Sequence, residues 1–263
     1  MPEALGPDGT RIAYRTRGKG PRHVVLVPGW MVSGKAFDAL VERLDVTGLT
    51  LVMPDLRGSG ESARPGRDHG IERHAADVLA VVDALGAETF VVVGHSMGGQ
   101  VAQWLAASYP ERVAGQVLLC PVPASGLPFP PDAATLFRQS TGNRDSQRTI
   151  LGLAAPGFKG DALEALLDDA GTVSREAIEQ GFDAFSTGGF ADKLGAIRAP
   201  TLVVATDDAF LSPALLRERV CDPIAGSRLA YLPGPGHYPH CERPVETAAL
   251  LEAFLAALPL PIA

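Results

Sequence analysis

Residues 90–99 read Phe-Val-Val-Val-Gly-His-Ser-Met-Gly-Gly, and this stretch decides the fold. Its apolar, valine-rich start predicts a buried strand, whereas from Gln100 to Ala107 the apolar residues recur at helical spacing. The chain therefore reverses from strand to helix around Ser96, inside a Gly-x-Ser-x-Gly frame. The small residues Gly94 and Gly98 allow the strand and the helix to approach that closely.

A serine on such a turn projects from the carboxyl edge of a parallel sheet. The amide of Met97 follows it at the N-terminus of a helix, where a developing negative charge is stabilised. A Gly-x-Ser-x-Gly frame by itself also occurs in plain glycine-rich turns. The strand before it and the helix after it favour the functional interpretation, and we predict that Ser96 is a nucleophile.

The composition describes an ordinary globular domain. The chain has 263 residues, of which 46% are hydrophobic and 20% are charged, and this length suits a single α/β domain. A formal charge of −7 without any basic run argues against a nucleic-acid surface. We expect a small-molecule substrate, with neither nucleic acid nor a membrane as a partner, and a monomer or homodimer.

The N-terminal residues and the cysteines indicate the compartment. The start of the chain has neither the basic residues nor the apolar stretch of a signal peptide, and no apolar run has the length of a membrane span. Cys120, Cys221 and Cys241 form an odd, scattered set without metal-ligand spacing. We therefore predict a cytoplasmic protein without a metal site.

Strand-like and helix-like patterns alternate along most of the chain. Apolar runs at 24–27, 50–53, 90–93 and 116–119 predict strands of a parallel sheet, and the intervening helical patterns fall at 36–44, 71–85 and 100–108. The alternating residues 11–14 predict an antiparallel edge strand. Strands at 201–205 and 228–232 and a helix at 245–258 complete the pattern. We predict a doubly wound, mostly parallel sheet with helices on both faces.

One segment interrupts this alternation. Five prolines between 121 and 131 cannot lie inside a sheet or a helix, so the chain leaves the sheet there. Short amphipathic helical patterns follow to about residue 190. We predict a core domain of residues 1–125 and 196–263 and a helical cap, or lid, of residues 126–195.

A nucleophilic serine requires a base, and the base requires an orienting carboxylate. His237 lies in a loop directly after the last predicted strand, at the same sheet edge as Ser96, and is the candidate base. Asp207 and Asp208 directly follow the strand at 201–205. Either carboxylate is placed to orient His237, and Asp208 is the first choice over Asp207.

With these residues in place, the whole chain resembles the α/β-hydrolase superfamily, in which the order is also serine, acid, histidine. The resemblance rests on residues 27–30 (Val-Pro-Gly-Trp), 55–62 (Asp-Leu-Arg-Gly-Ser-Gly-Glu-Ser), 199–205 and 236–244. It implies a sheet of the eight-stranded type, and an oxyanion hole formed by the backbone amides of Trp30 and Met97. It departs from the family pattern at Ala205, where glycine is usual, and at Pro213, which lies five rather than four residues after Asp208.

The resemblance implies acyl transfer through an acyl-enzyme, without a cofactor. The predicted cap supplies apolar and aromatic side chains that would favour an uncharged, largely apolar carboxylic ester or lactone. The candidate pocket residues are Leu127, Phe129, Phe137, Phe182, Phe185 and Tyr238.

Several other activities remain open on the same fold. Trp30 resembles the Gly-Trp of perhydrolase and haloperoxidase members, which suggests peroxyacid formation. A carbon–carbon bond hydrolase of ring-cleavage products uses the same triad, and a cofactor-independent ring dioxygenase uses the histidine without serine attack. A small-molecule receptor with little turnover is a further alternative.

Overall fold

The computed structural model describes residues 1–234 and 236–259. Within these residues eight strands form one sheet in the order β1-β2-β4-β3-β5-β6-β7-β8. β1 and β2 are antiparallel to their neighbours, and the other pairs are parallel. The predicted fold class is confirmed. The strands are β1 (Glu3–Leu5), β2 (Arg11–Gly18), β3 (Arg22–Val27), β4 (Leu49–Pro54), β5 (Phe90–His95), β6 (Val113–Leu119), β7 (Thr201–Ala205) and β8 (Arg228–Tyr231).

The edge of the sheet differs from the prediction. β2 is antiparallel, as predicted, but it is the second strand, because Glu3–Leu5 pairs along it as the edge strand β1. Only Ala4 of β1 is buried, so this three-residue strand carries no apolar pattern that a sequence reading detects. β5 lies inside the sheet between β3 and β6, and all six of its residues are buried.

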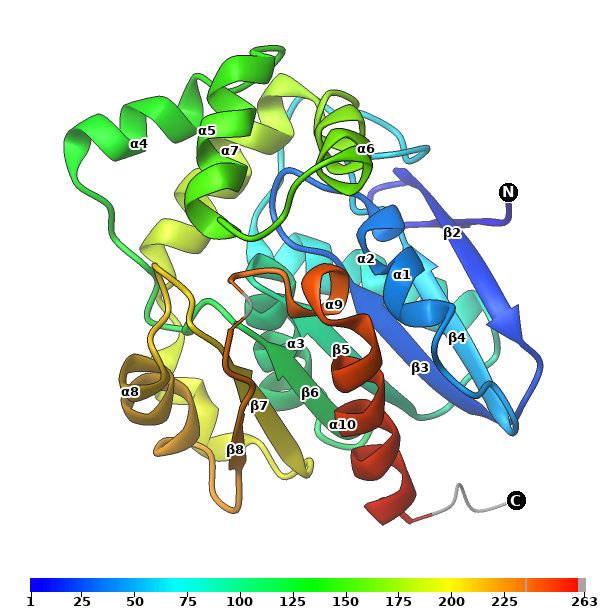
Figure 1. The fold of residues 1–263 in the computed structure, drawn as a ribbon. Coiled ribbons are helices and arrows are strands. Elements are labelled where there is room, and N and C mark those ends of the chain that lie inside the picture. Colours follow the sequence, from blue (N-terminus) through cyan, green and yellow to red (C-terminus); the bar gives the residue numbers. More distant parts are fainter. Residues whose placement is uncertain (235, 260–263) are drawn as a thin grey trace.

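Helices cover both faces of the sheet (Figure 1). One face packs against α2 (Ile71–Ala84) and α3 (Met97–Ser108), and the other against α1 (Asp38–Val41) and α10 (Pro244–Ala257). The predicted helix at 36–44 is instead a 3-10 turn, η1 (Gly34–Phe37), followed by the single turn of α1. The shorter elements η2 (Ala191–Ala196), α8 (Pro213–Leu216), η3 (Arg217–Cys221) and α9 (Pro239–Glu242) complete this domain.

Four consecutive helices lie together above one end of the sheet (Figure 1). They are α4 (Pro131–Arg138), α5 (Arg144–Ala154), α6 (Asp161–Ala170) and α7 (Arg175–Thr187), and we call the segment that contains them, residues 126–188, the cap. The chain leaves and re-enters the sheet domain at one point, because the Gly189 amide donates to the Ala124 carbonyl over 2.9 Å. A Cβ on Gly188 would lie 2.2 Å from the Gly126 nitrogen, so the two crossing chains are in backbone contact.

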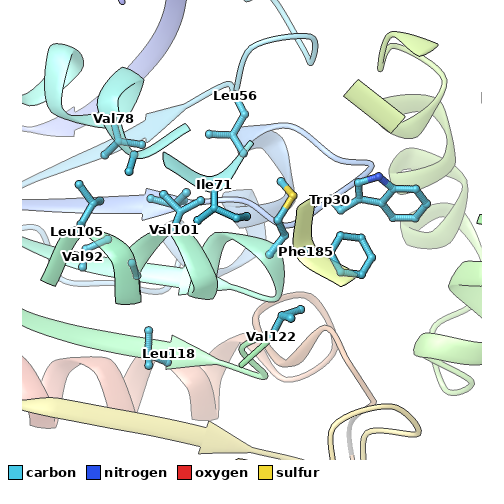
Figure 2. Close-up of a cluster of buried hydrophobic side chains, with 14 of the residues drawn as sticks. Trp30, Leu56, Ile71, Val78, Val92, Val101, Leu105, Leu118, Val122 and Phe185 are labelled. Atoms are coloured by element: carbon cyan, nitrogen blue, oxygen red, sulfur yellow. The ribbon is translucent and has the colours of Figure 1, made fainter. Parts of the chain in front are cut away.

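One apolar cluster runs from the body of the sheet to the cap. Figure 2 follows it from Val78 and Leu105, beside the sheet, to Trp30 and Phe185 under the cap. The cap is therefore packed on the core by burial of apolar surface, the dominant favourable term in folding. None of the helices within residues 1–234 and 236–259 has the length and continuous apolar character needed to cross a lipid bilayer.

Candidate active site

Ser96 lies on a tight turn between β5 and α3. Its backbone has φ 53° and ψ −119°, a left-handed conformation that is unusual for a residue other than glycine. A Cβ on Gly94 would lie 2.3 Å from the Gly98 carbonyl oxygen, and one on Gly98 would lie 2.2 Å from the Val27 carbonyl oxygen. No side chain fits at either glycine, so the turn requires both of them.

The side chain of His237 faces Ser96 across the carboxyl edge of the sheet. Its Nε2 lies 2.8 Å from Ser96 Oγ, and its Nδ1 lies 2.5 Å from Asp208 Oδ2. All three residues are buried, with 7–9% of their surface exposed. The three side chains therefore form one continuous hydrogen-bonded chain, in which Nδ1 faces the carboxylate and Nε2 faces the hydroxyl.

The two neighbouring aspartates have different surroundings. Asp208 is buried and accepts a second hydrogen bond from the Phe210 amide over 2.7 Å. Burial would raise the pKa of Asp208, but the charge and hydrogen bond of His237 and the backbone amides outweigh it and lower the pKa below its usual value. Asp207 is exposed and instead accepts hydrogen bonds from the Tyr231 hydroxyl and the Gly234 amide.

Three groups that the sequence analysis did not assign to the site fix the backbone around His237. Glu242 accepts hydrogen bonds from the amides of Gly236 (3.0 Å) and Tyr238 (3.1 Å), on either side of the histidine. The His237 amide donates to the Ala154 carbonyl of the cap over 2.7 Å. His95 Nε2 lies 2.9 Å from the His237 carbonyl, so this nitrogen carries the proton and donates it.

His95 and His240 form a buried pair beneath His237. Their ring centroids lie 4.3 Å apart, and both residues are fully buried. Burial, followed by the neighbouring histidines, lowers the pKa of His95 well below its ordinary value and that of His240 to about 3. Both rings are therefore neutral at physiological pH, and their contribution is packing and, for His95, the hydrogen bond to the His237 carbonyl.

The two residues predicted to form an oxyanion hole are both close to the cavity that holds Ser96. Met97 follows Ser96 as the first residue of α3, and Trp30, in the loop after β3, lines the same cavity as Ser96. Within the described part of the chain, neither backbone amide donates to a protein acceptor. The Trp30 indole is anchored elsewhere, because its Nε1 donates to the Ile178 carbonyl of α7 over 2.9 Å.

A small apolar cavity of about 40 Å³ opens onto Ser96 and His237. The cap closes it from above, where the Trp30 ring stacks on Phe137 and meets the edge of Phe185. Phe182 does not line the cavity but packs behind these rings. The lining residues are Trp30, Met31, Ser96, Val122, Leu127, Phe129, Phe137, Ile150, Ala154, Phe185, Phe210, Leu211, His237 and Tyr238.

One group of potential metal ligands coincides with the hydrogen-bonded chain. The donor atoms of Cys120, Asp208 and His237 all lie within 4.8 Å of one another, the one such trio among the described residues. Asp208 and His237 already face each other, and Cys120 Sγ pairs with Thr206 Oγ1 at 3.3 Å. Burial raises the pKa of the Cys120 thiol, which disfavours the thiolate that a metal requires.

An eight-stranded sheet of this order, with a serine on the turn after its central strand, defines a hydrolase of the α/β class. The family model for the α/β hydrolase fold matches residues 22–159. A non-heme haloperoxidase of Rhodococcus erythropolis is 34% identical over 90% of this chain and 93% of its own. The chain therefore belongs to the α/β-hydrolase fold family.

Two further proteins extend the comparison. A bifunctional esterase/perhydrolase of Acinetobacter calcoaceticus is 27% identical over 95% of this chain and 96% of its own. The solved structure of Est816, an N-acyl homoserine lactone degrading enzyme, is 28% identical with a TM-score of 0.81. The match covers 96% of this chain and the whole of the Est816 chain. The relatives thus match this chain over nearly its whole length, including the cap.

Proposed function

We propose that the protein is a serine hydrolase that cleaves an uncharged, largely apolar carboxylic ester or lactone. The observation that carries this proposal is the hydrogen-bonded chain from Ser96 through His237 to Asp208, which ends at an apolar cavity. Relatives named as an esterase/perhydrolase and a lactone-degrading enzyme support the same chemistry.

The proposed reaction passes through an acyl-enzyme. His237 takes the proton of Ser96 as Oγ attacks the carbonyl carbon, and Asp208 holds the imidazole in the required tautomer and stabilises its charged form. The amides of Trp30 and Met97 donate to the oxyanion of the tetrahedral intermediate. The alcohol leaves with the proton from His237, and water then attacks the acyl-enzyme with His237 again as the base.

The cavity supports an uncharged acyl group. Among its fourteen lining residues, all described by the structure, there is no lysine or arginine. A carboxylate placed there would lose its hydration without gaining a partner, which is costly. This argues against a carbon–carbon hydrolase of ring-cleavage products, because such a substrate carries a second carboxylate.

The test is hydrolysis of p-nitrophenyl esters of two to eight carbons, and of simple lactones, by the wild type, Ser96→Ala and His237→Ala. We expect turnover by the wild type and a loss of roughly 10⁴-fold or more in both variants. Asp207→Asn is the matched control, because Asp207 is exposed and does not contact His237. Turnover that survives in Ser96→Ala would reject serine attack, as in a ring dioxygenase, and binding without turnover would identify a receptor.

Perhydrolysis is a second candidate activity, favoured by the relatives named haloperoxidase and perhydrolase and by Trp30 beside Ser96. Hydrogen peroxide would replace water as the acceptor of the acyl group, giving a peroxycarboxylic acid and free Ser96. Peroxyacid formation from a short-chain acid and hydrogen peroxide measures it. If the enzyme hydrolyses esters but forms no peroxyacid, perhydrolysis is rejected and ester hydrolysis remains the proposed activity.

A further inference from the structure

The loop that carries the Trp30 amide is held by the cap as well as by the sheet domain. The Trp30 indole donates to the Ile178 carbonyl of α7 over 2.9 Å. Three residues later, the backbone amide and the hydroxyl of Ser33 both donate to Asp169 of α6. Trp30, whose amide is proposed to bind the oxyanion, is therefore held directly by one anchor and by a second anchor three residues later, and both anchors belong to the cap.

Asp169 is an unusual acceptor. It is 6% exposed, and Ser33 is fully buried. Its Oδ2 accepts from the Ser33 amide over 2.7 Å and its Oδ1 from the Ser33 hydroxyl over 2.6 Å. Burial raises the pKa of Asp169, while the bonds from Ser33 act in the opposite direction. A carboxyl group buried in this way, with two bonds to one residue of another domain, fixes the position of that residue.

The segment between the two anchors needs such restraint. Met31, directly after Trp30, has φ 69°, a left-handed conformation that a methionine rarely adopts. Without an outside restraint this residue would relax to a negative φ, and the relaxation would turn the adjoining chain that carries the Trp30 amide. Met31 and Val32 pack into the apolar core, but within the described residues the next hydrogen bond to the sheet domain is that of the Gly34 amide to Asp55, over 2.9 Å.

We infer that Asp169 is a positioning residue for the oxyanion hole, acting through Ser33, and that the cap thereby sets the geometry of a catalytic donor as well as enclosing the substrate. The inference rests on the proposed function. An oxyanion donor acts mainly on the transition state, so displacing it lowers kcat more than it changes KM.

The experiment compares Asp169→Ala, Asp169→Asn and Ser33→Ala with the control Glu164→Gln. Glu164 lies on the same cap helix, but its carboxylate faces solvent and pairs with Arg144 and Arg148 of α5. Steady-state hydrolysis of a p-nitrophenyl ester gives kcat and KM, and a fluorophosphonate that labels Ser96 gives the fraction of folded enzyme. Binding of an alkyl boronic acid, which mimics the tetrahedral intermediate, is measured alongside.

We expect Asp169→Ala to lower kcat by about 10- to 100-fold per labelled site, less than the roughly 10²–10³-fold for a whole donor. KM should stay within about threefold, boronic acid affinity should fall in parallel with kcat, and Ser33→Ala and Asp169→Asn should show smaller losses of the same kind. Glu164→Gln should match the wild type. If Asp169→Ala does not fold, the two milder variants carry the test.

Two results would overturn the inference. One is a kcat per labelled site in the Asp169 and Ser33 variants equal to that of Glu164→Gln. The other is a loss that appears only in KM, with boronic acid affinity unchanged. Failure of the proposed function would give a different result, because Ser96→Ala would then turn over the ester as fast as the wild type.

Discussion

The two walls of the cavity are built in different ways. In the wall that belongs to the sheet domain, backbone turns and hydrogen bonds position the polar groups, with Ser96, His237 and Asp208 each fixed by hydrogen bonds of 2.5–2.8 Å. The wall that belongs to the cap consists mainly of aromatic rings in contact, such as those of Phe129 and Phe137, whose ring centroids lie 4.8 Å apart. Hydrogen bonds and glycine turns tolerate little displacement, whereas apolar packing tolerates changes of size. We therefore expect changes in the first wall to abolish activity and changes in the second to alter substrate preference.

The largest effect is expected within the first wall, between two adjacent residues. Asp208→Asn should lower kcat by about 10⁴-fold, because an amide at this position favours the wrong tautomer of His237. Asp207→Asn should change kcat by less than about threefold, since its contacts go to Tyr231 and Gly234. Ester hydrolysis by the two variants measures the difference. Equal losses of kcat in the two variants would contradict the proposal that Asp208, and not Asp207, orients His237.

The next contrast sets a glycine of the sheet domain against a glycine of the cap. Gly98→Ala places a Cβ 2.2 Å from the Val27 carbonyl oxygen and 2.5 Å from that of Pro28, and should destabilise the protein by about 3 kcal/mol. Gly152→Ala, in helix α5 with no atom within 4 Å of the new Cβ, should stabilise it by about 0.5–1 kcal/mol. Urea unfolding of both variants gives the two values. A neutral Gly98→Ala would show that the turn is looser than its contacts imply.

The buried histidine pair predicts how stability depends on pH. His240 has a pKa of about 3 when folded and about 6.5 when unfolded. Between these values the unfolded state binds more protons, so stability falls as pH decreases, by about 1.4 kcal/mol per pH unit for each such histidine. Between pH 6.5 and 5, the free energy of unfolding of His240→Leu should therefore fall by about 1.6 kcal/mol less than that of the wild type, since the unfolded histidine is half protonated at pH 6.5. Urea unfolding at the two pH values tests this, and an identical loss would contradict it.

The smallest effect is expected in the cap wall. Phe129→Ala enlarges the cavity, so the ratio of kcat/KM for a hexanoate to that for an acetate ester should rise by about 10-fold. Phe158→Ala is the control, because Phe158 lies in the cap but does not line this cavity. Comparison of the two esters for both variants gives the ratios. A loss of all turnover in Phe129→Ala would mean that the cap wall also serves the chemistry.

The sequence predicts the sheet domain far better than the contacts around the site. Runs such as 24–27 and 90–93 are apolar because their strands are covered on both faces, so burial is written into consecutive residues. The sequence does not reveal β1, because a three-residue edge strand buries only one side chain. The order of Ser96, the aspartates and His237 is visible in the sequence because each residue follows a recognisable strand.

Other contacts leave no trace in the local sequence. Ser33 and Asp169 are 136 positions apart, and serine in a loop and aspartate in a helix are residue types that usually lie on the surface, so neither residue signals its burial. Nor does a single histidine before Ser96 reveal that His95 supports the backbone of His237. Such contacts depend on how two domains pack, which no periodic pattern records. Between Asp207 and Asp208, the burial and hydrogen bonds of the folded chain single out Asp208 as the neighbour of His237.

The contact between Gly126 and Gly188 determines where the length of the cap can change. Because the chain leaves and re-enters at one point, the segment between these glycines can change in length without moving any strand, as at sites where domains are inserted during evolution. A shortened gene that joins Ser125 directly to Gly189 would preserve the path of the sheet domain. The crossing of the two glycines is thus the place where a change in the length of the cap would disturb the strands least, provided that the cap contacts of Trp30 and Ser33 are kept.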